Sequence, residues 1–297
     1  MQCNGIICVN KPSGFTSFDV VAKLRGILKM KKLGHSGTLD PMATGVLPVF
    51  AGSATKAISI IPVGDKKYTA GFRLGLTTDT QDITGKIISE GGFDVSFQQV
   101  KISAKKMTGA IKQIPPMFSA VSVGGKRLYE LARQGIEIER EARDITVYSI
   151  DILSFDEKTG QGKLSIFCSK GTYVRTIIHD MGVFLGCGAV MTSLVRTSSN
   201  GFSIDDCYTL EQLEALRDEE KLESAVIPVE RLFSSLPSII LDKRKTALYK
   251  NGVKLRFDQL EGITEDKIYK VYGDGGFIGT AKADFEEKIL RVDKNLF

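Results

Sequence analysis

Several residue types that mark common kinds of protein are scarce or missing in this sequence. The 297 residues contain no tryptophan and only two histidines, His35 and His179. The five cysteines include no CxxC pair, so their spacing predicts neither a disulfide framework nor a zinc knuckle. Two histidines also leave few ligands for an ordinary zinc site. We therefore expect reduced thiols and no metal.

Motifs for nucleotides, hydrolysis and membrane insertion are missing as well. The sequence has no GxxxxGK[ST] loop, no GxGxxG after a strand and no GxSxG, which disfavours enzymes built on those phosphate loops or nucleophile elbows. No apolar run approaches the ~18 residues that span a bilayer. The first residues show no charged leader followed by a hydrophobic stretch. We expect a cytoplasmic protein with no membrane partner.

What is present is the composition of a globular protein with an uneven charge. Hydrophobic residues make up 42% of the chain and charged residues 25%, and at roughly 150 residues per domain the length suggests two domains or one with an appendage. Residues 1–67 carry nine basic and three acidic side chains, although the whole chain has a net charge of only +5. A regional basic excess suits a surface that binds a polyanion, and it is equally found on ordinary solvated surfaces.

Hydrophobic periodicity predicts a mixed chain with long antiparallel strands. Alternating apolar residues favour strands at 143–155 and 163–169, joined by a turn at 158–162. The segment 33–53 is broken by glycine and proline and reads as one long structured loop. Further strands are expected at 5–9, 68–74, 86–89 and 189–196, and helices after Thr16 or Ser17, at 97–107, at 126–133 and after Thr209. A loop that begins at Gly171 should continue as a helix whose apolar stripe includes Ile177, Met181 and Phe184.

A change in composition predicts a domain boundary near the C-terminus. Segment 224–238 has two prolines and four serines and looks like a connection. The residues after it predict a short helix closed by Asn251-Gly252 and a hairpin that turns at 274–276. We expect a domain of residues 1–235 and a small module of residues 239–297.

One acid in the glycine-rich segment stands out as a candidate catalytic group. Asp40 lies among apolar neighbours, and Pro41 biases it toward an extended backbone. A partly buried carboxylate needs a cationic partner, and Arg175 in another glycine-led segment is the best one. A loop acid that caps its own turn has the same spacing. His35 and Tyr68 could stack on a base, and both also fit ordinary turn and strand positions.

A long ordered series of motifs resembles one family. GHSGTLDPMATGVLPV (34–49) is similar to the signature of the TruB family of tRNA pseudouridine-55 synthases. Matching segments follow in order across about residues 5–200: VNKPSGFTSFDVV (9–21), ATKAISI (54–60), KKYTAGFRLGLTTDTQDITG (66–85), IPPMFSAVSVGGKRLYELARQG (114–135), REARDITVY (140–148) and CSKGTYVRTIIHDMGVFLGCGA (168–189).

The resemblance implies an α+β pseudouridine synthase fold with a largely antiparallel sheet, and a small C-terminal PUA-like domain that binds RNA. It implies isomerisation of uridine to pseudouridine in the T loop of tRNA by a monomer without metal or cofactor. The catalytic residues would be Asp40, Tyr68 as the aromatic contact of the target base, and Arg175 as the partner of Asp40. The substrate-binding residues would be His35, Lys11, Lys56, Gly34 and Leu194, with His35 stacking in the T loop and the two lysines near the RNA backbone.

Two positions depart from the family pattern, and several mechanisms stay open. Phe118 and Ser122 stand where the family often has Tyr and Lys, so the resemblance does not by itself imply an RNA contact near Ser122. Attack of Asp40 on C1′, addition to C6 and removal of a ribose proton are equally compatible with the residues. An RNA-binding chaperone without catalysis and a phosphate-binding metabolic enzyme are the rival functions, and only the synthase would form pseudouridine in a T-stem-loop RNA.

The uneven charge predicts that RNA affinity falls steeply with salt. If phosphate contacts from residues 1–67 dominate binding, log K against log [salt] has a slope of about −0.7 per single-stranded phosphate neutralised. Binding titrations between low and high salt measure it. Replacing Lys31 and Lys32 by Gln flattens the slope if they contact phosphate, and an unchanged slope would assign both lysines to solvent.

Overall fold

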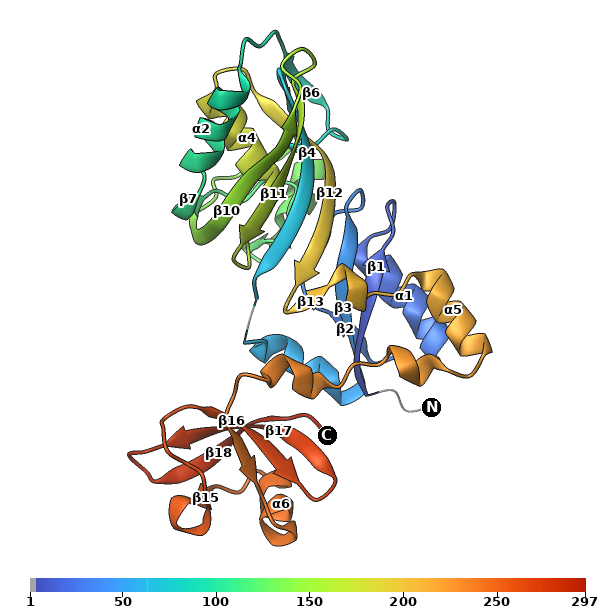
Figure 1. The fold of residues 1–297 in the computed structure, drawn as a ribbon, viewed down its shortest axis with the longest axis vertical. Helices are drawn as coiled ribbons and strands as arrows, with labels where there is room; N and C mark the ends of the chain where they lie inside the picture. The colour runs from blue at the N-terminus through green and yellow to red at the C-terminus, as the bar shows by residue number, and fades with distance from the viewer. Residues whose placement is uncertain (1–3, 63) are drawn as a thin grey trace.

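The computed structural model describes residues 4–62 and 64–297 and contains two separate large sheets (Figure 1). The first is built from nine strands and carries most of the chain. Its strand order is β1 (Gly5–Lys11), β3 (Thr44–Ala51), β12 (Ala189–Ser199), β4 (Lys66–Leu74), β11 (Gln161–Cys168), β10 (Arg143–Phe155) and β7 (Gly109–Gln113), with β2 (Leu33–His35) paired to β3 and β13 (Phe202–Ser203) paired to β12.

The pairs of this sheet are antiparallel apart from one short parallel contact. That contact joins β3 to β12 and covers only two registers, Val195 opposite Thr44 and Arg196 opposite Gly45. It connects the part of the sheet around β1 to the part around β4. Figure 1 shows β4 as a long strand beside β12. The prediction of a largely antiparallel α+β fold is confirmed.

Gly45 allows the two parts of the sheet to meet closely. Its φ of +103° lies in the region that favours glycine. A Cβ on Gly45 would lie 2.2 Å from the carbonyl oxygen of Arg196. A side chain at this position would therefore push β3 away from β12.

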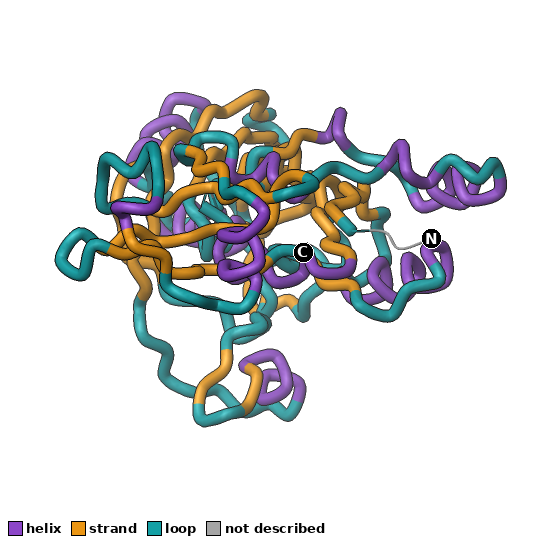
Figure 2. Tube along the Cα trace, turned by 90° about the horizontal axis from the view of Figure 1, so that it is seen from below, coloured by secondary structure: helices purple, strands orange, loops and turns teal. Residues whose placement is uncertain are grey.

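The helices lie at the periphery of the strands (Figure 2). In Figure 1, α2 packs against β10 and lies beside α4, which packs against β12 and β4, while α1 packs against α5 beside β1. The α-helices are α1 (Ser17–Leu28), α2 (Phe97–Lys106), α3 (Leu128–Arg133), α4 (Val174–Phe184), α5 (Leu210–Asp218) and α6 (Lys243–Lys250); the 3-10 helices are η1 (Gly52–Ile60), η2 (Ile204–Asp206), η3 (Leu222–Ala225), η4 (Val229–Phe233) and η5 (Phe257–Gln259). Two small hairpins add β5 (Leu76–Thr78) with β6 (Ile87–Glu90), and β8 (Ser122–Val123) with β9 (Lys126–Arg127).

Most predicted elements are confirmed, and two details are wrong. Helix α1 begins after the capping residue Thr16, and β10 pairs with β11 as the alternation predicted. The segment 33–53 is not one loop, because β2 and β3 occupy most of it and only residues 36–43 lie between them. Buried on both faces, β3 lacks the alternation that marks a strand. Phe184, expected on the buried stripe of α4, is 48% exposed.

The second sheet lies at the C-terminal end of the chain and has its own core. Its order is β14 (Ser238–Ile240), β16 (Ile268–Gly273), β17 (Gly276–Asp284), β18 (Ile289–Asn295) and β15 (Leu255–Arg256), with α6 packed beside it. The segment before it is not an open connection. Phe233 in η4 is buried, and its ring centroid lies 5.9 Å from that of Phe277 on β17. Leu296 also belongs to the buried hydrophobic cluster to which β1 and β3 contribute.

None of the helices in residues 4–62 and 64–297 combines the length and hydropathy that a membrane crossing requires.

Gly45→Ala is expected to lower the free energy of unfolding by about 2–4 kcal/mol, because the new Cβ meets backbone that cannot rotate away. Urea denaturation measures the loss. Gly135→Ala is the matched control, since Gly135 also has a positive φ of +71° but open space around its Cβ position. It should cost about 1 kcal/mol. Equal losses in the two variants would contradict the close approach of β3 and β12.

Candidate active site

The short loop between β2 and β3 presents Asp40 and is fixed from several sides. The hydroxyl of Ser17, in the first turn of α1, accepts a hydrogen bond from the backbone N–H of Leu39 at 2.9 Å. The N–H of Gly14 donates to the carbonyl of Pro41, and the N–H of Ala43 donates to the carbonyl of Asp40. These bonds hold the backbone on both sides of Asp40, so the carboxylate is presented from a rigid turn.

Asp40 forms a two-point ion pair with Arg175 from α4. Arg175 Nε lies 2.9 Å from Asp40 Oδ2, and Arg175 Nη2 lies 3.2 Å from Asp40 Oδ1. The guanidinium side chain is only 5% exposed, whereas the Asp40 side chain is 34% exposed. A flat guanidinium matches a carboxylate through two parallel bonds. The structure therefore leaves the carboxylate accessible and hides its counter-charge behind it.

Other groups fix the orientation of Arg175. Its Nη1 donates to the carbonyl of Thr80 at 2.8 Å, and its Nη2 donates to the carbonyl of Phe118 at 2.9 Å. Asp82 Oδ2 lies 3.8 Å from Nη1. Asp82 is itself held through Oδ1, which accepts from the N–H and the hydroxyl of Thr84. Sequence reasoning missed Asp82, although a second acid in the TTDTQDITG segment was a visible signal.

Burial and charge act on Asp40 in opposite directions. Burial raises the pKa of the Asp40 carboxyl, and the nearby charge of Asp82 raises it further. Arg175 lowers this pKa, and Lys11 lowers it to a smaller extent, but the balance stays above the ordinary value for aspartate. Burial thus favours the protonated form of Asp40, and the two cations Arg175 and Lys11 favour the carboxylate.

Tyr68 lies on β4 directly opposite Arg196 of β12 and is 6% exposed. Burial raises the pKa of its phenol to about 12, although Arg196 opposes the shift. Tyr68 is therefore a neutral phenol at physiological pH. Arg196 is fully buried and donates to the carbonyls of Val46 at 2.7 Å and Gly37 at 3.0 Å. Sequence reasoning missed Arg196, which ties the Asp40 loop to the strand beside Tyr68.

The two lysines implied by the resemblance have different surroundings. Lys11 is fully buried, and its ammonium donates to the carbonyls of Pro12, Phe15 and Pro41. Burial lowers its pKa to about 8. All three donors of its ammonium are therefore used inside the protein, where they support the Asp40 loop. Lys56 is exposed on η1, with its Nζ 5.8 Å from the ring centroid of Phe297.

His35, Gly34 and Leu194 surround the same loop. His35 is half-buried on β2, and burial, together with the charge of Arg196, lowers the pKa of its ring. Its Nδ1 has no hydrogen-bond partner among the residues that the structure describes. A Cβ on Gly34 would lie 3.0 Å from Ile58 on η1, so glycine allows that packing. Leu194 is buried on β12 in the same cluster as Leu39 and Tyr68.

The departures at Phe118 and Ser122 have different consequences. Phe118 contributes its backbone carbonyl to Arg175, which any residue type could supply. Ser122 is exposed on β8.

Within residues 4–62 and 64–297, no three His, Cys, Asp or Glu side chains gather in a metal-binding arrangement.

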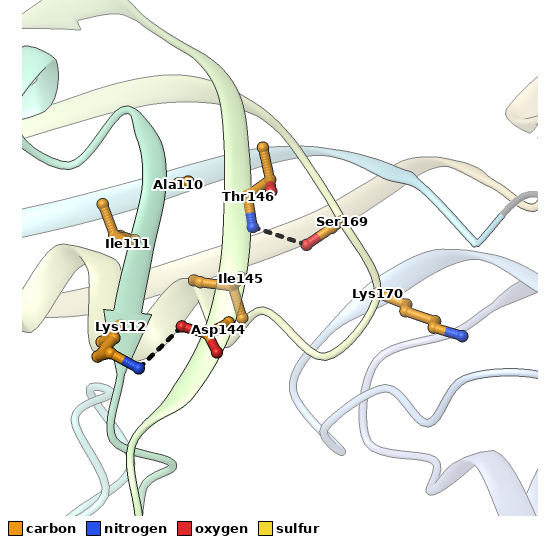
Figure 3. Close-up of a pocket in the computed structure, with 8 residues that line it drawn as sticks. All are labelled: Ala110, Ile111, Lys112, Asp144, Ile145, Thr146, Ser169 and Lys170. Atoms are coloured by element: carbon orange, nitrogen blue, oxygen red, sulfur yellow. Dashed lines mark hydrogen bonds and ion pairs between the residues drawn. The ribbon is translucent and has the colours of Figure 1, made fainter.

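A pocket of about 490 Å³ lies away from Asp40, on the outer strands β7 and β10 (Figure 3). Figure 3 shows its ion pair between Lys112 and Asp144, 3.0 Å long, and the hydrogen bond from the Thr146 N–H to the Ser169 hydroxyl. Neither Asp40 nor Arg175 lines it. The candidate site is therefore defined by the Asp40 loop and not by this pocket.

Solved structures share this fold over nearly the whole chain. A crystal structure of a Cbf5-Nop10-Gar1 complex superposes with a TM-score of 0.74 at 26% identity, covering 99% of this chain and 85% of that one. An H/ACA RNP bound to a substrate RNA containing 2′-deoxyuridine superposes with a TM-score of 0.73 at 25% identity, covering 99% and 85%. The fold is that of the pseudouridine synthases.

Sequence comparison identifies the family. The model described as TruB family pseudouridylate synthase (N terminal domain) matches residues 25–174, and the tRNA pseudouridylate synthase B C-terminal domain model matches residues 175–234. The tRNA pseudouridine synthase B of Clostridium kluyveri is 41% identical, covering 97% of this chain and 99% of that protein. The one of Levilactobacillus brevis is 43% identical, covering 91% of each. The chain belongs to the TruB pseudouridylate synthase family.

Asp82→Asn is expected to lower the pKa of Asp40, because it removes the negative charge that raises this pKa while keeping an oxygen for Thr84. Titration of the carboxyl carbon of Asp40 by ¹³C NMR measures the change. Asp144→Asn on the outer strand β10 is the control and should leave the titration unaltered. A titration that moves upward in Asp82→Asn would show that Asp82 acts mainly by orienting Arg175.

Proposed function

We propose that this protein converts uridine to pseudouridine at position 55, in the T loop of tRNA, with Asp40 as the catalytic residue. The observation that carries the proposal is the accessible Asp40 carboxylate, which is held in two-point contact with the buried Arg175. The relatives from Clostridium kluyveri and Levilactobacillus brevis are named tRNA pseudouridine synthase B. Their similarity over nearly the full length supports tRNA as the substrate of this protein.

The reaction rearranges atoms within one nucleotide. The bond between C1′ and N1 breaks, the uracil turns, and a bond between C1′ and C5 forms; C5 loses a proton and N1 gains one. Breaking the glycosidic bond places positive charge on the sugar, which a nearby carboxylate stabilises or captures. Asp40 is the group in the site suited to this. Addition to C6 and removal of a ribose proton are alternative first steps for the same carboxylate.

Tyr68 and Arg175 assist Asp40 in different ways. Tyr68 offers the face of its ring to the extruded base and keeps its proton, because its pKa is about 12. Arg175 lowers the pKa of Asp40 and fixes the plane of the carboxylate. Both contributions depend on a geometry that is set before the substrate arrives. Electrostatic catalysis is most effective when the charged groups do not have to reorganise during the reaction.

The T-loop uridine must leave its stack to reach Asp40, at a cost of a few kcal/mol. His35 is suited to fill the vacated place, because its ring is half-exposed. The lowered pKa of the ring also favours its neutral form. Gly34 and Leu194 shape the surface beside it. Lys56 and the basic residues of segment 1–67 bind phosphates and supply affinity that does not depend on sequence.

The C-terminal sheet is the proposed accessory part of the enzyme. We assign residues 239–297 to a PUA-like RNA-binding domain and residues 1–235 to the catalytic domain, because the five-stranded sheet has its own hydrophobic core. We also propose that the enzyme is a cytoplasmic monomer that recognises the T stem-loop and needs neither cofactor nor metal. The Leu296 and Phe277 contacts with the catalytic part indicate that the accessory domain is held in a defined place.

Asp40→Asn is expected to abolish pseudouridine formation while tRNA binding stays within a few-fold of wild type, because the amide keeps the shape of the carboxylate and loses its charge. A T-stem-loop RNA tritiated at C5 of uridine measures the chemistry, since the reaction releases that label. Filter binding of the same RNA measures affinity.

Asp144→Asn is the matched control for this experiment and should release label at the wild-type rate. Label release at that rate by Asp40→Asn would remove Asp40 from the mechanism. No release by the wild-type protein, with RNA binding intact, would favour the RNA-binding chaperone instead.

A further inference from the structure

A buried glutamine connects the edge of the large sheet to the start of the helix that carries Arg175. Gln113 is the last residue of β7 and is 2% exposed. Its Nε2 donates to the carbonyl of Tyr173 at 3.0 Å, and its Oε1 accepts from the N–H of Tyr173 at 2.8 Å. The amide of one side chain therefore pairs with both backbone groups of one residue far away in sequence. Losing either bond would leave a buried polar group without its partner.

The backbone that Gln113 holds leads directly into Arg175. Tyr173 is the N-cap residue of α4, and its own side chain makes no capping hydrogen bond. Arg175 follows two residues later, so the direction in which its side chain leaves the helix depends on how Tyr173 is placed. Ser169 anchors the turn before it to β10 through Thr146 (Figure 3), but Gln113 bonds the residue at which the helix begins.

Gln113 also begins the segment that supplies another contact of Arg175. Ile114 and two consecutive prolines, Pro115 and Pro116, connect Gln113 to the neighbourhood of Phe118. Each proline has a fixed φ, which limits the bending of this connection. The carbonyl of Phe118 then accepts from Arg175 Nη2 at 2.9 Å. Both the backbone of Arg175 and one acceptor for its guanidinium are thus tied to the same buried amide.

We propose that Gln113 is a positioning residue for catalysis, which holds Arg175 in the plane that pairs with both oxygens of Asp40. It touches neither the substrate nor the reacting atoms. The inference rests on the proposed role of Asp40 and adds a residue that the motif similarity did not single out. Displacement of a catalytic group by about 1 Å can cost about 100-fold in rate, so a bond this far from the carboxylate still affects the chemistry.

The acid side of the rate profile reports whether Arg175 is in place. Three charged groups act on the pKa of Asp40: Arg175 and Lys11 lower it, and Asp82 raises it. If Arg175 moves away, the pKa of Asp40 rises and the carboxylate is protonated at a higher pH. The acid limb of the single-turnover rate must then move to higher pH, which a simple loss of stability would not produce.

The test compares Gln113→Leu and Gln113→Glu with the wild-type enzyme on the C5-tritiated T-stem-loop. Gln113→Leu removes both bonds to Tyr173, and we expect kcat to fall by about 10–100-fold with KM within about threefold. Its acid limb should move to higher pH. Gln113→Glu keeps the acceptor for the Tyr173 N–H but loses the donor to the Tyr173 carbonyl and buries a negative charge, so its rate should also fall and its acid limb should also move to higher pH. If Gln113→Leu does not fold, the rate and acid limb of Gln113→Glu decide the question.

Two further measurements separate positioning from a structural effect. Val100→Ala truncates a fully buried core side chain on α2 and should lower the melting temperature without moving the acid limb. In an Arg175→Lys background, Gln113→Leu should cost little more, because the residue it positions is already lost. A wild-type rate and acid limb in both Gln113 variants overturns the proposal. The proposal is also overturned if Val100→Ala, at an equal loss of stability, lowers the rate and moves the acid limb as much as Gln113→Leu does. It is overturned as well if the rate losses of Gln113→Leu and Arg175→Lys are fully additive in the double variant.

The outcomes also distinguish this inference from the proposed function. Product formed by Asp40→Asn would overturn the role of Asp40 and with it the reason for positioning Arg175. An inactive Asp40→Asn together with an unaffected Gln113→Leu would overturn only the role of Gln113.

Discussion

The site depends on a buried cation that faces a partly exposed anion. Placing the guanidinium of Arg175 inside the protein is unfavourable unless its donors are satisfied, because an ion loses several kcal/mol of hydration on burial. The structure meets this requirement with the carboxylate of Asp40 and the carbonyls of Thr80 and Phe118. These acceptors come from three separate segments. The need to satisfy one cation therefore brings together the loop, the turn and the strand connection that form the site.

A second buried arginine solves a related problem at the joint of the sheet. Arg196 donates to the carbonyls of Val46 and Gly37, on either side of the Asp40 loop. Its backbone approaches Gly45 in the only parallel pairing that the structure describes in the large sheet. Lys11 supports the same loop from below through the carbonyl of Pro41. Arg196 and Lys11 thus hold the backbone of the loop, while Arg175 and Lys11 lower the pKa of Asp40.

The charges around Asp40 give its carboxyl two properties that a solvent-exposed aspartate lacks. Burial makes the carboxylate a stronger electrostatic partner, because less water screens it. Burial also raises its pKa, and Arg175 and Lys11 act in the other direction. The geometry of Arg175 is therefore part of the chemistry, and residues that hold Arg175, such as Asp82 and Gln113, influence Asp40 without touching substrate.

The sequence by itself determined the antiparallel fold class, most of the helices and strands, and the pairing partner of Asp40. These follow from local periodicity, from caps such as Thr16, and from the rule that a buried carboxylate needs a fixed cation. It failed at β3, because a strand buried on both faces shows no alternation. It did not reveal that the ammonium of Lys11 donates to buried carbonyls, because residue type does not show which acceptors surround an ammonium. Asp82, Arg196 and Gln113 acquire their roles only from partners between 60 and 159 residues away in sequence. Tertiary structure alone decided those roles, since hydrogen bonds between distant segments leave no spacing in the chain.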